Sequence, residues 1–224
     1  ALKLLKTFDS TSGTATGGGT ATGGGSPAGG GSATGSGQAA IQQFENEFKV
    51  LKKLSHPNIG KIGDYGYEEE QKKVFFTSPW LKGSDLYSAT KELSFEKCED
   101  YFVQVLRAIN YLHQKEIIHC DLKPGNIFVE DSTVLLIDFG LAGYWGESIV
   151  GTPTYLAPEI YRGGHHNAAS DLYALGVIFY NCLTRTQPFS GSSLQEVYDR
   201  HRTYTPPPIS RLNPQTPKYF SDIV

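Results

Sequence analysis

Two short apolar runs on either side of a polar turn constrain the fold of this chain most. The runs are residues 127–129 and 134–137, and the turn between them reads Glu-Asp-Ser-Thr. This pattern predicts a β-hairpin. Asp121 and Asn126 precede the first run and Asp138 follows the second, so the hairpin would bring these side chains to one end of its ladder.

The side chains at this end of the hairpin have the chemistry of a site for a metal-bound phosphate. Carboxylate and amide oxygens are hard ligands, which suit Mg²⁺ better than zinc. Lys123 stands two residues after Asp121 and adds a positive charge beside the same oxygens. The sequence therefore predicts a substrate that carries phosphate and binds together with a metal ion.

The rest of the chain shows helical spacing of apolar residues, with a few further strand-like runs. The predicted helices cover residues 41–54, 95–115, 172–183 and 194–202. The further predicted strands cover residues 74–77 and 117–118. The proline-rich residues 206–217 are predicted to form a loop.

Residues 10–37 differ in composition from everything around them. These 28 residues carry no charge and hold 12 of the 25 glycines. Residues 14–37 are four six-residue repeats without any apolar side chain larger than alanine, so the segment has nothing to bury. We interpret it as a flexible insertion between folded elements.

Charge, hydropathy and cysteine pattern exclude several classes of protein. Lys plus Arg number 20 against 23 Asp plus Glu, and this balance predicts no nucleic-acid partner. The longest nearly apolar run, residues 173–183, is too short to span a bilayer, and no secretory leader is visible, so no membrane segment is expected. The three cysteines are far apart and form no CxxC pair, which predicts reduced thiols and a cytoplasmic protein.

Three motifs in order resemble those of the eukaryotic-type serine/threonine protein kinases. They are HCDLKPGN at 119–126, DFG at 138–140 and GTPTYLAPE at 151–159. The resemblance implies an α+β, two-lobed fold, with a small β-rich N-lobe that holds one main helix and a mainly helical C-lobe. It covers residues 1–9 and 38–224.

The resemblance also implies the limits of the two lobes. Residues 1–81 are expected to form a partial N-lobe that lacks the glycine-rich loop and carries the insertion at 10–37. Residues 82–224 are expected to form a C-lobe that stops before its last helices. The chain has no methionine, and we interpret it as an excerpt of a longer protein with bacterial features.

The motifs imply ATP, Mg²⁺ and a protein substrate, with phosphoryl transfer to serine or threonine hydroxyls. Asp121 resembles the catalytic aspartate that accepts the proton of the substrate hydroxyl, and Lys123 resembles the lysine that steadies the γ-phosphate. The metal ligands would be Asn126 and Asp138. The segment that docks the protein substrate would include Gly151 and Thr152.

The remaining expected contacts to ATP come from the first lobe and from the segment that joins the lobes. Lys3, paired with Glu47, would hold the α- and β-phosphates. The adenine ring would lie between Ala1 and Phe128. Backbone groups of the joining segment and one carboxylate facing the ribose complete the set, at Pro79, Leu81 and Asp85.

The chain departs from the family pattern at Cys120, which replaces an arginine that binds a phosphorylated activation loop. Ser148 is the candidate phosphosite, but we expect Ser148→Ala to leave activity largely intact because this arginine is missing. Cys120 itself is expected to be a buried, inert thiol rather than a redox switch. His119 is expected to be structural, and Asp171 to hold the backbone of the catalytic loop.

Two other readings stay open at the level of sequence. A nucleotide-binding pseudokinase would usually show degraded motifs, whereas Lys3, Asp121, Asn126 and Asp138 are intact. A small-molecule kinase of the aminoglycoside or choline type shares the scaffold but usually lacks the GTPxYxAPE segment. That segment favours a protein as the substrate.

Overall fold

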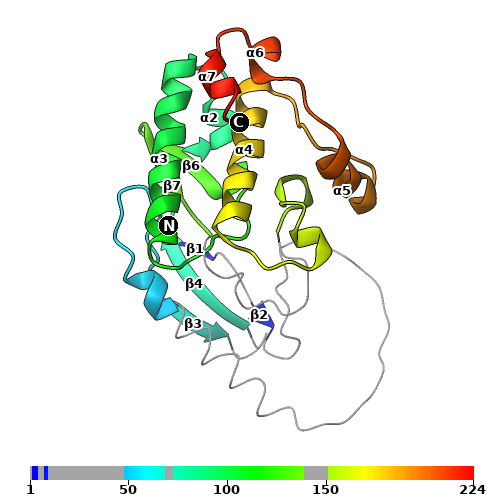
Figure 1. Ribbon diagram of the computed structural model, residues 1–224. Coiled ribbons are helices and arrows are strands. Elements are labelled where there is room, and N and C mark those ends of the chain that lie inside the picture. Colours follow the sequence, from blue (N-terminus) through cyan, green and yellow to red (C-terminus); the bar gives the residue numbers. More distant parts are fainter. Residues whose placement is uncertain (1, 5–7, 10–47, 69–72, 139–150) are drawn as a thin grey trace, which may run out of the picture. The chain divides into compact units, whose positions relative to one another are not determined.

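The computed structural model describes two compact units (Figure 1). The described residues are 2–4, 8–9, 48–68, 73–138 and 151–224. One unit comprises Ala1–Leu54 with Lys61–Trp80, and the other comprises Ser55–Gly60 with Leu81–Val224. The predictions for Ala1, Glu47, Ser148 and the repeats lie outside the described residues.

The first unit is built on β4 (Lys73–Pro79), the central strand of an antiparallel sheet. β2 (Phe8–Asp9) and β3 (Tyr65–Glu68) both pair with Val74, so they lie on opposite edges of β4. β1 (Leu2–Leu4) pairs further along, and its register places Lys3 opposite Ser78. The strand predicted at 74–77 is confirmed and is longer than expected.

The described part of the predicted helix at 41–54 is helical over residues 48–52. The ring of Phe48 is buried, with its centroid 4.7 Å from that of Tyr65. On the same helix, Nζ of Lys52 lies 3.0 Å from Oδ1 of Asp64. This segment therefore packs its apolar side on the start of β3, while its charged side chains face the solvent.

Two long helices form the centre of the second unit and lie side by side (Figure 1). α3 (Phe95–His113) buries one stripe of apolar side chains, as its spacing predicts. α4 (Ala168–Thr184) is buried over most of its length and begins at a capping box between Asn167 and Ser170. The rings of Phe102 and Phe179 stack between the two helices, with centroids 4.0 Å apart.

The predicted hairpin is confirmed in the second unit. β6 (Ile127–Glu130) and β7 (Thr133–Leu136) pair antiparallel, and β5 (Ser84–Asp85) pairs with the other edge of β6. Asp131 and Ser132 form the turn with φ angles of 47° and 64°, as in a type I′ turn.

The remaining elements of the second unit are short helices. They are α2 (Leu86–Ala89), η1 (Pro124–Asn126), η3 (Pro153–Tyr155), η4 (Ile160–Arg162), α5 (Leu194–Thr203), α6 (Ile209–Leu212) and α7 (Lys218–Ser221).

Two predictions of local structure are wrong. Residues 117–118 form no strand, because the amide of Ile117 bonds back to the carbonyl of Leu112 and closes the end of α3. The predicted loop at 206–217 contains α6, which begins directly after Pro208. Proline is compatible with the start of a helix, and Ile209 is buried there, so packing outweighs the local proline signal.

Residues 55–60 are fastened to the hairpin of the second unit. The side-chain amide of Asn58 is buried and donates to Oε1 of Gln104 at 2.8 Å and to the carbonyl of Val134 at 2.9 Å. The backbone amide of Leu136 donates to the carbonyl of Asn58, and the carbonyl of Leu136 accepts from Gly60. These residues therefore extend the sheet beyond β7 through a parallel bridge.

Among the helices that the structure describes, none combines the length and the apolar character needed to cross a lipid bilayer.

Candidate active site

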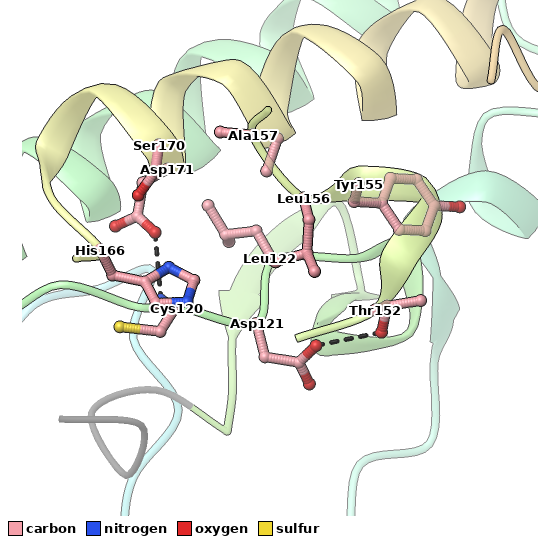
Figure 2. Close-up of a pocket in the computed structure, with 11 residues that line it drawn as sticks. Cys120, Asp121, Leu122, Thr152, Tyr155, Leu156, Ala157, His166, Ser170 and Asp171 are labelled. Atoms are coloured by element: carbon pink, nitrogen blue, oxygen red, sulfur yellow. Dashed lines mark hydrogen bonds between the residues drawn. The ribbon is translucent and has the colours of Figure 1, made fainter. Parts of the chain in front are cut away.

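The carboxylate of Asp121 contacts several candidate site residues, and Figure 2 shows its hydrogen bond with Thr152. Its Oδ2 lies 2.7 Å from Nζ of Lys123 and accepts a second hydrogen bond from Nδ2 of Asn126 at 3.2 Å. Its Oδ1 accepts from the hydroxyl of Thr152 at 3.0 Å. Four residues that sequence analysis assigned to one reaction are therefore in direct contact.

The backbone before Asp121 is held by a buried carboxylate on α4. Asp171 accepts hydrogen bonds from the amide of His119 at 2.9 Å and from the amide of Cys120 at 3.1 Å. Its Oδ2 also lies 2.9 Å from Nε2 of His113 on α3. The scaffolding role expected for Asp171 agrees with these contacts, since Cys120 has a φ of 67° that a non-glycine residue rarely adopts.

His119 is completely buried, and its Nε2 lies 3.1 Å from the carbonyl of Ile137. This contact joins the segment before Asp121 to the residue before Asp138. The structural role expected for His119 agrees with this placement, while its expected neighbour Phe139 lies outside the described residues.

Asp138 follows directly and has the properties of a metal ligand. Its φ is 59°, and its Oδ1 is buried without any hydrogen-bond partner among the described residues. A buried carboxylate oxygen without a donor is costly unless a cation or water satisfies it. The amide of Asn126 is fixed by bonds from its Nδ2 to the carbonyl and to Oδ2 of Asp121. The residues present therefore fit a hard divalent cation.

The described residues contain no cluster of the kind that binds zinc in proteins. No group of three His, Cys, Asp or Glu side chains that could hold a metal gathers there. The donor set of Asp138 and Asn126 consists of oxygens, which magnesium prefers.

The described residues that are assigned to ATP are divided between the two units, and the position of each is given within its unit. Lys3 lies opposite Ser78 in the sheet of the first unit, and Pro79 ends β4 there. In the second unit, Asp85 pairs with Phe128 across β5 and β6. Leu81 begins the segment that leads to β5 and is half-buried. Their expected roles toward ATP stay predictions.

Asp85 has a local role that sequence analysis missed. Its Oδ1 accepts from the amide of Ser88 at 3.0 Å, and its Oδ2 accepts from the hydroxyl of Ser88 at 2.7 Å. The side chain therefore caps the N-terminus of α2. An aspartate three residues before a serine at the start of an apolar segment was the available signal.

A tyrosine that sequence analysis also missed stabilises the turn that carries Thr152. Gly151 has a φ of 117°, which suits glycine, and a Cβ there would come within 3.0 Å of the Cys120 carbonyl. The hydroxyl of Tyr161 donates to the carbonyl of Pro153 at 2.5 Å. Tyr161 therefore ties η4 to the turn that delivers the Thr152 hydroxyl to Asp121.

Cys120 gives a direct chemical prediction. Burial, together with the nearby carboxylates of Asp171 and Asp121, raises the pKa of its thiol to about 12. Since the thiolate is the reactive form, its fraction at neutral pH falls about a thousandfold relative to a cysteine with the ordinary value of 9.0. We expect iodoacetamide to label Cys120 at least a hundredfold more slowly in the native protein than in urea. Peptide mass spectrometry measures both rates, and equal rates would contradict the expected inertness.

Comparison with known proteins decides the family. The sequence matches the family described as "Protein kinase domain" over residues 32–221, which is most of the chain. The chain belongs to the protein kinase family. The predicted protein-kinase-like fold is confirmed, and the kinase domain has the mixed α and β content that its motifs imply.

Several relatives of this kinase domain carry names that include serine/threonine-protein kinase. The sequence is 33% identical over 196 residues to "Probable serine/threonine-protein kinase PknB" of Lactococcus lactis. It is 35% identical over 192 residues to "DNA damage-responsive serine/threonine-protein kinase RqkA" of Deinococcus radiodurans. It is 31% identical over 192 residues to "Serine/threonine-protein kinase ULK3" of Xenopus laevis.

These alignments cover most of the kinase domain but a minor part of each relative. They include 83%, 78% and 80% of this chain, in the same order. They include 31%, 28% and 41% of the relatives. The chain thus spans about a third of the length of the curated proteins that it matches.

Proposed function

We propose that the chain is the catalytic domain of a serine/threonine protein kinase, which transfers the γ-phosphate of ATP to serine or threonine hydroxyls of a protein. The observation that carries this proposal is the set of hydrogen bonds around Asp121. A carboxylate offers about four acceptor positions. Lys123 and Asn126 occupy two on Oδ2, and Thr152 occupies one on Oδ1. With respect to the residues that the structure describes, one position on Oδ1 therefore stays available for the hydroxyl of a substrate.

The residues around Asp121 divide the work of the reaction. Asp121 accepts the proton of the attacking hydroxyl at Oδ1 and orients that hydroxyl. Lys123 lies on the other oxygen, where its ammonium balances the carboxylate and can steady the γ-phosphate. Thr152 fixes the carboxylate in one orientation and begins the segment that receives the protein substrate. A bound magnesium ion would supply charge neutralisation of the phosphates.

The proposed nucleotide contacts follow from the family and from the placed residues. Asn126 and Asp138 hold the magnesium ion, and the orphaned Oδ1 of Asp138 supports this assignment. The phosphate contacts are assigned to Lys3 and Glu47. The adenine and ribose contacts are assigned to Ala1, Pro79, Leu81, Asp85 and Phe128. The three cysteines are unpaired and buried, and we place the reaction in the cytoplasm, where thiols stay reduced.

A nucleotide-binding pseudokinase is the second candidate. The chain binds ATP in both cases, but a pseudokinase transfers no phosphate. The geometry of Asp121 favours the enzyme, since three donors hold its carboxylate in one orientation.

Phosphoryl transfer from γ-labelled ATP tests the proposal. The intact protein is incubated with myelin basic protein, a generic basic substrate, with Mg²⁺ or with EDTA. We expect label on serine and threonine with Mg²⁺ and its loss with EDTA. Absence of label while Mg·ATP still raises the melting temperature would indicate the pseudokinase. Absence of both effects would reject both candidates.

A further inference from the structure

A buried histidine lies in an aromatic cluster next to the turn that carries Thr152. His201 of α5 is only 9% exposed, and its ring centroid lies 4.2 Å from that of Phe189. The rings of Tyr173 on α4 and Tyr161 on η4 complete the cluster, with centroids 5.6 Å and 5.9 Å away. α5 packs against η3, so the cluster joins three elements next to one short turn.

The protonation state of His201 follows from its surroundings. Burial lowers its pKa to about 4, so the imidazole is neutral at physiological pH. Burial also raises the pKa of the Tyr173 hydroxyl, which therefore keeps its proton. The Tyr173 hydroxyl and Nδ1 of His201 lie 2.6 Å apart and share one hydrogen bond, which holds the imidazole ring in place.

The ring of His201 packs against Tyr161, and the hydroxyl of Tyr161 holds the turn that carries Thr152. The Pro153 carbonyl acts on the imidazole and raises its pKa, against the effect of burial. That carbonyl already accepts from the Tyr161 hydroxyl at 2.5 Å and from the Leu156 amide at 3.2 Å. Both lone pairs of the oxygen are therefore used, and Nε2 of His201 is buried without a hydrogen-bond partner among the described residues. His201 therefore acts on the carbonyl through its packing against Tyr161.

The Pro153 carbonyl connects this cluster to the candidate catalytic carboxylate. Pro153 follows Thr152 directly, and the Thr152 hydroxyl donates to Oδ1 of Asp121. Oδ1 is also the oxygen with an acceptor position left for a substrate hydroxyl. Anything that moves the Pro153 carbonyl therefore moves a donor on that oxygen.

We propose that His201 is a positioning residue for the protein substrate. Held by Tyr173, it packs against Tyr161, which fixes the Pro153 carbonyl and with it the Thr152 hydroxyl on Asp121. This inference rests on the proposed kinase function and adds a residue to the docking side of the site. It predicts an effect on the protein substrate and none on ATP, because the contacts of His201 among the described residues include no residue assigned to ATP.

Kinetics of the intact protein separate these two effects. We expect His201→Leu and Tyr173→Phe each to raise the KM for myelin basic protein about tenfold, and to change the KM for ATP less than twofold. His201→Gln keeps a neutral side chain that can accept and donate, so we expect it to restore most of the affinity. His165→Leu changes an exposed histidine of the same unit and serves as the matched control. Equal rises in both KM values, or unchanged kinetics in all variants, would overturn the proposal.

A second readout needs no enzymatic activity. Long-range ¹H–¹⁵N spectra of the histidine rings should show His201 neutral at pH 7. Hydrogen exchange of the Leu156 amide, which bonds to the Pro153 carbonyl, should be about tenfold faster in Tyr173→Phe. A positively charged His201 ring at pH 7, or unchanged exchange, would refute the positioning role even if the unmutated protein phosphorylated nothing. Failure of phosphoryl transfer alone would instead refute the proposed function.

Discussion

Asp121→Asn is expected to lower kcat for phosphoryl transfer by about 10²–10⁴-fold, the usual contribution of a positioned general base. An amide cannot accept the proton of the substrate hydroxyl. The substitution also replaces one acceptor oxygen by an NH₂ group. This new donor would face another donor, either the Thr152 hydroxyl or the pair formed by Lys123 and Asn126, so a hydrogen bond is lost in both orientations. Binding of ATP should persist, since Asp121 is assigned to the hydroxyl and not to the nucleotide.

The measurement is a comparison of initial rates with γ-labelled ATP, together with the shift in melting temperature caused by Mg·ATP. Asp131→Asn is the matched control, because it makes the same substitution at an exposed position in the hairpin turn and should keep full activity. An Asp121→Asn protein with more than a tenth of the unmutated rate would remove Asp121 from the role of base.

Asp171→Ala is expected to give the largest loss of stability, about 3–5 kcal/mol, which is typical of breaking a buried, hydrogen-bonded charged network. The carboxylate is 2% exposed and accepts from two backbone amides while it contacts His113. Its removal leaves the amides of His119 and Cys120 buried without an acceptor. Without this acceptor, Cys120 can leave its positive φ conformation and displace Asp121, the next residue. Activity should therefore fall together with stability.

Thermal unfolding followed by calorimetry measures the first effect, with an expected fall in melting temperature of about 10 °C for a domain of this size. Leu172→Ala is the control on the same turn of α4, because Leu172 is 52% exposed and should change the free energy of unfolding by less than about 0.5 kcal/mol. A melting temperature for Asp171→Ala within 2 °C of the unmutated protein would contradict the scaffolding role.

Much of the architecture of the second unit could be predicted from local patterns. The hairpin from Ile127 to Leu136 has two short apolar runs on either side of a polar turn, and α3 repeats apolar residues at helical spacing. Residues 117–118 looked like a strand because two β-branched residues stand together. No neighbouring strand pairs with them among the described residues, so the end of α3 determines their conformation.

The site was predicted as a set of residues but not as a set of contacts. Asp121, Lys123 and Asn126 are close in sequence, so their motif already implied that they act together. The bond between Tyr173 and His201 joins positions 28 residues apart on different helices, and no local pattern encodes it. Asp85 was predicted to contact the ribose, whereas the structure shows its side chain as the N-cap of α2, and a helix of only four residues has no periodic pattern that predicts such a cap.

The attachment of residues 55–60 to the hairpin has a consequence for how the kinase domain avoids association. β7 is the outermost strand of its sheet, and such an edge offers unpaired backbone groups to any extended chain. Asn58 and Gly60 occupy the groups of Leu136 on that edge. Six residues whose chain neighbours on both sides belong to the first unit thus cover the edge of the second. A second unit cut out at Leu81 would lose this cover and expose a strand that is ready to pair with another copy of itself.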